Sequence, residues 1–213
     1  MNRTRGFTII ELMTVVAVLG VALAIGVPSM SSFLLNNRLV SHLNSLSSTL
    51  TLARSEAVKR NQWTVVCGSS NGTTCVTDGK WETGWIAFVD RTTPHVIPPV
   101  PDFTAGVDGC AENAPAGEDC LLIAEAALPG AGNVGQTSGQ LMSLRGGTSI
   151  GNFIVYSGSG TPRCGGVDCV NVNTYFTICD HRGASHAHAL AISKTGRASV
   201  IETRLDGSAL TCP

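Results

Sequence analysis

The sequence predicts an α+β protein in which one long N-terminal helix packs on an antiparallel β-sheet domain that contains disulfides. Three observations support this prediction. An apolar run over residues 7–27 passes into an amphipathic pattern that extends to about residue 60. From residue 63 the hydrophobic period changes to two, which is typical of strands. All eight cysteines follow the apolar run.

The composition excludes several classes of protein. The 213 residues include 14 Lys+Arg and 15 Asp+Glu, so the formal net charge is −1 and there is no bulk basic field for nucleic acid or anionic lipid. Only 14% of residues are charged, against about 25% in typical soluble domains. With 24 glycines, the chain should contain many turns. A disordered chain, a coiled coil and an ordinary cytosolic enzyme are all disfavoured.

The first element is a predicted transmembrane helix over residues 7–28. Its apolar part, Phe7 to Val27, would be about 31 Å long as a helix, which matches the hydrocarbon core of a bilayer. Arg3 and Arg5 precede it, and the next cation is Arg38. The positive-inside rule therefore predicts a cytoplasmic N-terminus and a domain on the other side of the membrane.

One acidic residue, Glu11, interrupts the apolar run. A secretory signal peptide would explain the basic start, the apolar stretch and the Ala22-Leu23-Ala24 pattern. A plain membrane anchor would explain the length. Neither explains a carboxylate within the span, which costs about 2.5–3.5 kcal/mol on insertion scales and usually has a partner.

The segment Gly6-Phe7-Thr8-Ile9-Ile10-Glu11-Leu12 resembles the N-terminal signal of type IV pilins and type II secretion pseudopilins. The resemblance implies that residues 1–6 are a prepilin leader, that prepilin peptidase cleaves after Gly6, and that the new amine of Phe7 is methylated. It also implies that Glu11 neutralises the terminal amine of a neighbouring subunit during assembly, and that Pro28 kinks the helix.

Residues 29–60 form the predicted amphipathic half of the helix. Apolar residues recur there at mostly three- and four-residue spacing, from Phe33 and Leu34 to Ala57. Two further segments, Ala53–Ala57 and Gly84–Asp90, and the Lys194–Arg197 stretch near the end, resemble the FimT/GspH (FimU-like) branch of minor pilins and pseudopilins. A pilin fold is the architecture that this resemblance implies.

Residues 61–213 form the predicted β-rich domain, which we expect to lie in the periplasm or outside the cell. Gly, Ser, Asn and Asp clusters separate its strands. We interpret residues 91–140, which include a proline-rich loop, as an insertion. The predicted strands are 63–67, 85–90, 120–127, 140–144, 152–156, 174–179, 188–193 and 197–203.

The eight cysteines lie on the predicted non-cytoplasmic side, where disulfides are the default. Eight cysteines allow 105 pairings. Proximity in the sequence favours three pairs: Cys67–Cys75, Cys110–Cys120 and Cys164–Cys169. The family resemblance supports the remaining pair, Cys179–Cys212, which would hold the C-terminal tail against a strand.

Two patterns suggest a binding site, one for a dinucleotide and one for zinc, but the residues around each pattern argue against it. Gly130–Gly135 matches G-x-G-x-x-G, but Pro129 precedes it and no acid lies at the distance that a dinucleotide site requires. Cys179, His181, His186 and His188 could be considered as zinc ligands, but their spacing is not standard and disulfide formation competes for the thiol. We therefore predict no enzyme activity, no cofactor and no metal.

DNA binding is an open alternative. Some FimT-like pilins bind DNA through a Gly-Arg-x-Arg motif, of which Gly196-Arg197-Ala198-Ser199 keeps only the first arginine. Lys194, Arg197 and Arg204 are the candidate contacts, and Arg145 and Arg182 could join them in space. Without residues 1–6 the chain has 12 Lys+Arg against 15 Asp+Glu, a net charge of −3, which is unfavourable for contacting several phosphates.

The resemblance therefore implies a structural subunit, a minor pilin of the priming or tip complex of a type IV pilus. Its implied partners are other minor pilins, the major pilin, prepilin peptidase and the inner membrane, with DNA as a further candidate. It would occupy the inner membrane before assembly and the pilus at the cell surface afterwards. A GspH-like pseudopilin of a type II secretion system and a DNA-binding minor pilin for natural transformation are the alternatives.

Overall fold

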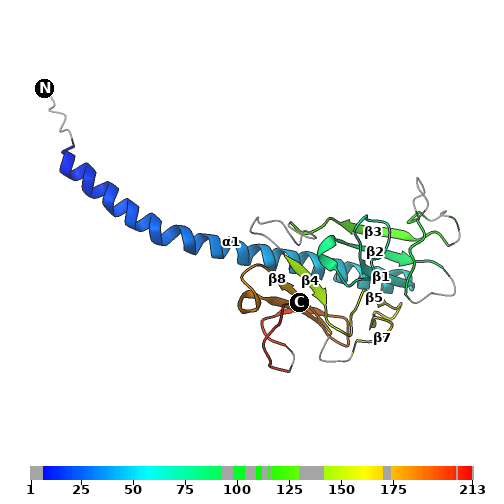
Figure 1. Ribbon diagram of the computed structural model, residues 1–213. Coiled ribbons are helices and arrows are strands. Elements are labelled where there is room, and N and C mark those ends of the chain that lie inside the picture. Colours follow the sequence, from blue (N-terminus) through cyan, green and yellow to red (C-terminus); the bar gives the residue numbers. More distant parts are fainter. Residues whose placement is uncertain are drawn as a thin grey trace. The chain divides into compact units, whose positions relative to one another are not determined.

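A computed structural model of the chain (Figure 1) describes residues 7–92, 98–103, 109–111, 115, 117–129, 142–169, 174–204 and 206–212, without the side chains of residues 27–29. The contacts divide the chain into two compact units, Met1–Arg38 and Leu39–Pro213. The first unit contains the N-terminal part of one long helix. The second contains the rest of that helix and all the strands.

Helix α1 spans Ile9–Arg60 and continues through Pro28 without a break. Thr8 caps its start, because the Thr8 hydroxyl accepts a hydrogen bond from the Glu11 backbone N–H at 3.3 Å. The other end has Lys59 and Arg60 in its last turn, where cations complement the helix dipole. Asn61 then adopts a left-handed conformation, with φ of 50°, and terminates the helix.

The part of α1 that belongs to the second unit buries one stripe of side chains. These residues are spaced alternately by four and three positions, so they share one face of the helix. All are fully buried: Leu39, Leu43, Leu46, Leu50, Ala53 and Ala57. The predicted stripe started earlier, at Phe33 and Leu34, but those side chains are 59% and 51% exposed.

Two antiparallel sheets form the rest of the second unit. The six-stranded sheet has the order β3-β2-β1-β5-β6-β7, and the four-stranded sheet has the order β10-β9-β8-β4. The strands are β1 Trp63–Gly68, β2 Trp85–Asp90, β3 Cys120–Glu125, β4 Ser143–Gly146, β5 Phe153–Tyr156, β6 Pro162–Cys164, β7 Val167–Asp168, β8 Tyr175–Cys179, β9 His188–Ile192 and β10 Ala198–Ile201.

The main core lies between α1 and both sheets. Val66 and Ile154 of the six-stranded sheet, and Phe176 and Leu190 of the four-stranded sheet, join the buried leucines of the helix in one cluster. The residues at alternate positions of β8 and β9 form a separate cluster on the outer face of the four-stranded sheet. Strands β8 and β9 of that sheet therefore have buried side chains on both faces.

A short 3₁₀ helix, η1 (Trp81–Thr83), contributes a buried side chain, Trp81, that contacts several elements of this core. The indole of Trp81 donates to the Gly151 carbonyl at 3.0 Å and packs edge-on against Phe176. Trp85, at the start of β2, donates to the Thr49 hydroxyl of α1 at 3.1 Å. Each buried indole N–H thus has a partner.

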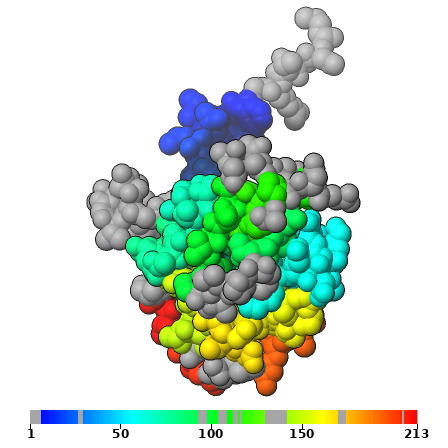
Figure 2. Space-filling view, turned by 90° about the vertical axis from the view of Figure 1, so that its right-hand side faces the viewer, coloured from blue at the N-terminus to red at the C-terminus, as the bar shows by residue number. Residues whose placement is uncertain are grey.

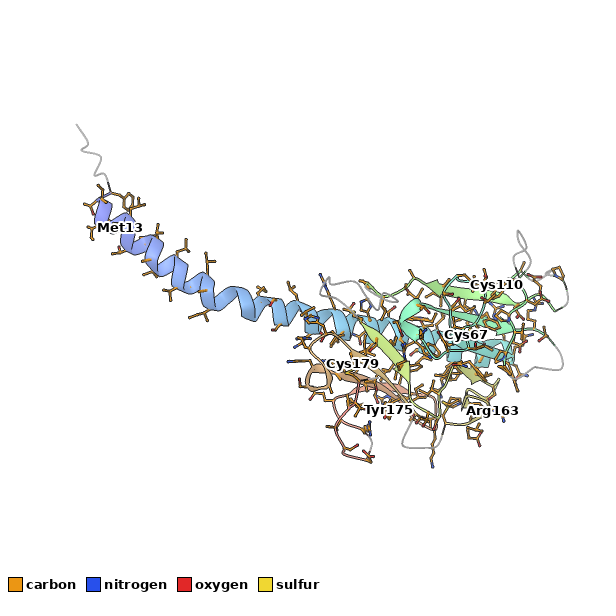
Figure 3. All side chains as sticks on the ribbon, viewed as in Figure 1. Met13, Cys67, Cys110, Arg163, Tyr175 and Cys179 are labelled. Atoms are coloured by element: carbon orange, nitrogen blue, oxygen red, sulfur yellow. A yellow bond between two sulfur atoms is a disulfide. The ribbon has the colours of Figure 1, made fainter. Side chains whose placement is uncertain are left out.

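The structure pairs the eight cysteines in the four combinations favoured from the sequence. Figure 3 labels one cysteine from each of three pairs: Cys67, Cys110 and Cys179. Their partners are Cys75, Cys120 and Cys212. The Cys179–Cys212 disulfide joins β8 to the C-terminal tail, 33 residues further along the chain.

The predicted fold class is confirmed, with three differences in detail. The strands belong to two sheets, and the short strands β6 and β7, on either side of a tight turn, were not predicted. Strand β4 begins at Ser143, whereas the predicted strand began at residue 140, which lies outside the described residues. Strand β3 lies within the segment interpreted as an insertion, yet it pairs directly with β2.

Candidate assembly helix and cationic sites

The N-terminal part of α1 is an apolar surface that no described part of the chain covers. Every described side chain from residue 7 to residue 26 is exposed. Among the described residues, α1 is the one helix long and apolar enough to cross a membrane, judged by length and composition alone. So much exposed apolar surface requires a covering, either lipid or other helices.

Glu11 lies in the first turn of this helix, three positions after its cap. The Thr14 hydroxyl donates to the Glu11 main-chain carbonyl at 2.9 Å. Among the described residues, the Glu11 carboxylate makes no ion pair. Its position in the first turn is electrostatically favourable because the helix N-terminus carries partial positive charge. Gly6, the predicted processing residue, lies outside the described residues, and Phe7 is exposed.

The candidate DNA contacts lie at two separate places. Lys194 and Arg197 belong to the turn between β9 and β10 and are exposed. Arg204 follows β10 at its other end, seven residues from Arg197, a span of up to about 23 Å. Arg145 lines a pocket with Arg204. Arg182 is already engaged, because its guanidinium donates to the Asp180 carboxylate.

The β9–β10 turn has a structural role that sequence reasoning missed. Gly196 has φ of +79°, and a Cβ there would lie 2.9 Å from Cε1 of Tyr156. Arg54 of α1 passes beside the same turn and donates from Nε to the Gly160 carbonyl at 3.1 Å. Burial raises the pKa of the Tyr156 phenol, and its hydroxyl donates to the Gly196 carbonyl at 3.4 Å. The C-terminal end of α1, the loop at Gly160 and the β9–β10 turn therefore contact one another.

Figure 2 shows this end of the domain, with the helix end in cyan, the residues around position 160 in yellow and those around position 195 in orange. Arg54 and Gly196 both belong to segments that resemble the FimT/GspH branch. The signal was present in the sequence, but only the structure brings the two segments into contact.

The other patterns considered from the sequence do not assemble into a site among the residues described. Gly130–Gly135 lies outside them. Cys179 forms a disulfide and so offers no thiolate to a metal. No group of three or more His, Cys, Asp or Glu residues with metal-binding geometry occurs within the described ranges.

A long helix whose described apolar side chains are exposed over residues 7–26, attached to an antiparallel β domain, defines the class of pilin-like filament subunits. The family model "Type II transport protein GspH" matches residues 42–196, and the model of the prokaryotic N-terminal methylation motif matches residues 1–27. The chain belongs to the GspH family of minor pilins and pseudopilins, which are structural subunits.

Two crystal structures of the type IV minor pilin FimU from Pseudomonas aeruginosa (strain PAO1) are similar to this chain. The one in space group P65 is 17% identical, covering 76% of this chain and 92% of that chain, with a TM-score of 0.40. The one in space group P21 is 18% identical, covering 78% and 89%, with a TM-score of 0.41.

Proposed function

We propose that this protein is a minor pilin that joins the priming or tip complex of a type IV pilus, beside other minor pilins and the major pilin. The observation that supports this most is Glu11, which lies in the first turn of an exposed apolar helix and makes no ion pair with any residue that the structure describes. The methyl-amine of a neighbouring subunit would supply its counter-charge. The apolar side chains around it would pack in the helical bundle of the filament.

This proposal divides the chain by function. Residues 1–6 are the leader that prepilin peptidase removes, residues 7–28 span the inner membrane, and residues 29–60 connect to the domain at 61–213. The N-terminus lies in the cytoplasm and the domain in the periplasm until assembly moves the subunit to the cell surface. Arg3 and Arg5, before the apolar run, support this orientation.

Substitution of Glu11 tests the assembly mechanism. Glu11→Ala should abolish incorporation into sheared pili and leave the protein in the membrane fraction at its normal level. Glu56→Ala is the matched control, because it removes a carboxylate from the same helix that pairs with Lys59 and Arg60 instead. Normal incorporation of the Glu11 variant would rule the mechanism out.

Processing is tested by intact mass and N-terminal sequencing of the protein from its native membrane. A chain that starts at N-methyl-Phe7 supports the proposal. A chain that starts at Met1, or close to Ile25, would mean a plain anchor or a secreted domain, and the role of Glu11 would have to be abandoned.

The family match makes the pseudopilin of a type II secretion system the second candidate. A deletion strain separates the two systems. Loss of twitching motility with normal protein secretion supports the pilus, and loss of secretion with normal twitching supports the pseudopilus.

DNA binding is the third candidate, and it is favoured by the exposed Lys194 and Arg197 in the turn whose Gly196 lies close to Arg54. A salt-dependent mobility shift with the purified protein tests it, since phosphate contacts weaken as salt rises. Arg197→Gln should weaken binding, and Arg182→Gln, which alters a guanidinium held by Asp180, should not. Absence of binding at low salt would exclude this candidate.

A further inference from the structure

The outer face of the four-stranded sheet carries a pocket of about 410 Å³ that the proposed function does not use. The sheet contributes Arg145 of β4 and Tyr175 and Thr177 of β8, and the C-terminal tail contributes Arg204 and Thr211. Figure 3 labels Tyr175 in this region. The pocket therefore lies between a sheet edge and a tail.

The register explains why these side chains share one face. Arg145 pairs with Thr177 across the β4–β8 ladder, and Tyr175 lies two residues before Thr177. Cys179 lies two residues after Thr177 and bonds to Cys212, which also lines the pocket. The alternation of a strand thus places the disulfide and the polar side chains on the same side. The disulfide holds the tail beside them.

Two guanidinium groups line this pocket, and each is only partly engaged. Arg145 donates to the Glu82 carboxylate from Nη1, with Asp78 contributing further negative charge nearby. Arg204 donates from Nη2 to the Thr211 hydroxyl, and the exposed Asp206 lies in its neighbourhood. The buried Nε–H of Arg204 meets no acceptor among the described residues, and Arg204 makes no ion pair there.

Three hydroxyl groups add to the polar lining. Those of Thr148, Tyr175 and Thr177 make no hydrogen bond within the described parts of the chain. A hydroxyl can donate one hydrogen bond to a ligand oxygen, and a guanidinium presents a planar fork of donors that matches a carboxylate or a phosphate. The two guanidinium groups therefore supply donors only, and each hydroxyl can turn its O–H toward a ligand oxygen.

We propose that the pocket formed by Arg145, Thr148, Tyr175, Thr177, Arg204 and Thr211 binds the oxyanion group of a small ligand, either a carboxylate or a phosphate. Its size accommodates one such group with a few attached atoms. A nucleic-acid backbone is not the expected occupant, because Lys194 and Arg197 lie at the far end of β10 and would not continue a phosphate track.

The test titrates the full chain, in micelles of an uncharged detergent, with inorganic phosphate and separately with succinate. Binding is followed by calorimetry and by the amide NMR signals of Gly146 and Gly147. At least one anion should bind saturably and shift both signals. Arg204→Gln should weaken this binding at least tenfold, because it removes a charge-assisted contact. Arg182→Gln removes a guanidinium that lies outside the pocket, so it should leave the anion binding unchanged.

Each outcome bears on the proposal. Saturation by phosphate alone or by succinate alone assigns the oxyanion and supports it. If Arg204→Gln fails to fold, Thr177→Val, which removes one lining hydroxyl, should still weaken binding. Failure of both anions to saturate overturns the proposal, as does equal weakening by Arg182→Gln. Competition between phosphate and a short DNA duplex for Arg204 would also overturn it.

Discussion

The two parts of helix α1 differ in what stabilises them. Up to residue 26 the described side chains are exposed all round the helix. From Leu39 onward one stripe is fully buried in the domain. The same secondary structure therefore has two different requirements. The first part needs lipid or neighbouring helices for its apolar surface, whereas the second part is stabilised by the chain's own sheets.

Paired leucine substitutions should produce the largest contrast between these two parts. Leu46→Ala removes a fully buried side chain and should destabilise the domain by about 2–5 kcal/mol. Leu19→Ala, at a side chain that is 56% exposed, should leave domain unfolding unchanged. Urea unfolding followed by the fluorescence of Trp81 and Trp85 measures both. Equal losses in the two variants would contradict the comparison.

Removal of the Cys179–Cys212 disulfide should also act on the second unit alone. The pair closes a long loop, so replacing both cysteines by serine should cost about 3–4 kcal/mol on the chain-entropy model. The short Cys164–Cys169 loop should cost only about 2 kcal/mol on the same model. Membrane attachment should be unaffected in both variants. Thermal unfolding and membrane fractionation test the two statements, and detachment of either variant would count against the division into two units.

A pair of glycine substitutions sharpens the comparison at smaller scale. Gly196→Ala should destabilise the domain by about 1–3 kcal/mol, because Gly196 has positive φ and its new methyl group would press on Tyr156. Gly20→Ala, in the first part of α1, meets no atom within 4 Å and should leave domain unfolding unchanged. Melting temperatures of the two purified variants provide the measurement. A Gly196 variant as stable as the wild type would contradict the close packing of Gly196 against Tyr156.

The last expected effect is a pH dependence located in the loop region of the second unit. Burial raises the pKa of Asp119 from 3.8 to about 6, and the negative charges of Asp90 and Asp102 raise it further. Hydrogen bonds from the backbone N–H groups of Arg91 and Asp102 oppose this rise. The folded state then binds this proton more tightly than the unfolded state. Its contribution to stability is complete below pH 4 and is lost as the pH rises through about 6.

Asp119→Asn should remove this contribution. The difference in unfolding free energy between the wild-type protein and the variant should therefore change between pH 4 and pH 7 and be constant outside that range. Urea unfolding at a series of pH values measures it. A pH-independent difference would mean that the pKa of Asp119 is the same in the folded and unfolded states.

Much of the fold could be predicted because patterns among residues close in the sequence indicate its helix and most of its strands. The apolar run, the amphipathic pattern that follows it and the change of period at Trp63 are all local signals. The division into two sheets could not be predicted, since strands with both faces covered look alike whichever sheet they join. The short strands β6 and β7 were missed because two or three residues give no detectable alternation.

The candidate sites divide in the same way. Glu11 could be singled out from its position in an apolar run. Lys194, Arg197 and Arg204 are close in sequence and were grouped, but β10 places Arg204 at the opposite end from the other two. The pocket of Arg145 and Arg204 joins residues 59 positions apart, and no local pattern marks such a pair.

The sequence by itself determined the membrane-length helix, the family and three of the four cysteine pairs, because each depends on residues that are close along the chain. The fourth pair, Cys179–Cys212, was supported by the family resemblance. Only the tertiary structure decided where burial on α1 begins, that Arg54 meets Gly160 and Gly196, and that a pocket with two arginines lies beside the C-terminal tail. These features depend on contacts between distant segments. Such contacts arise from packing and strand register, which the order of the residues does not display.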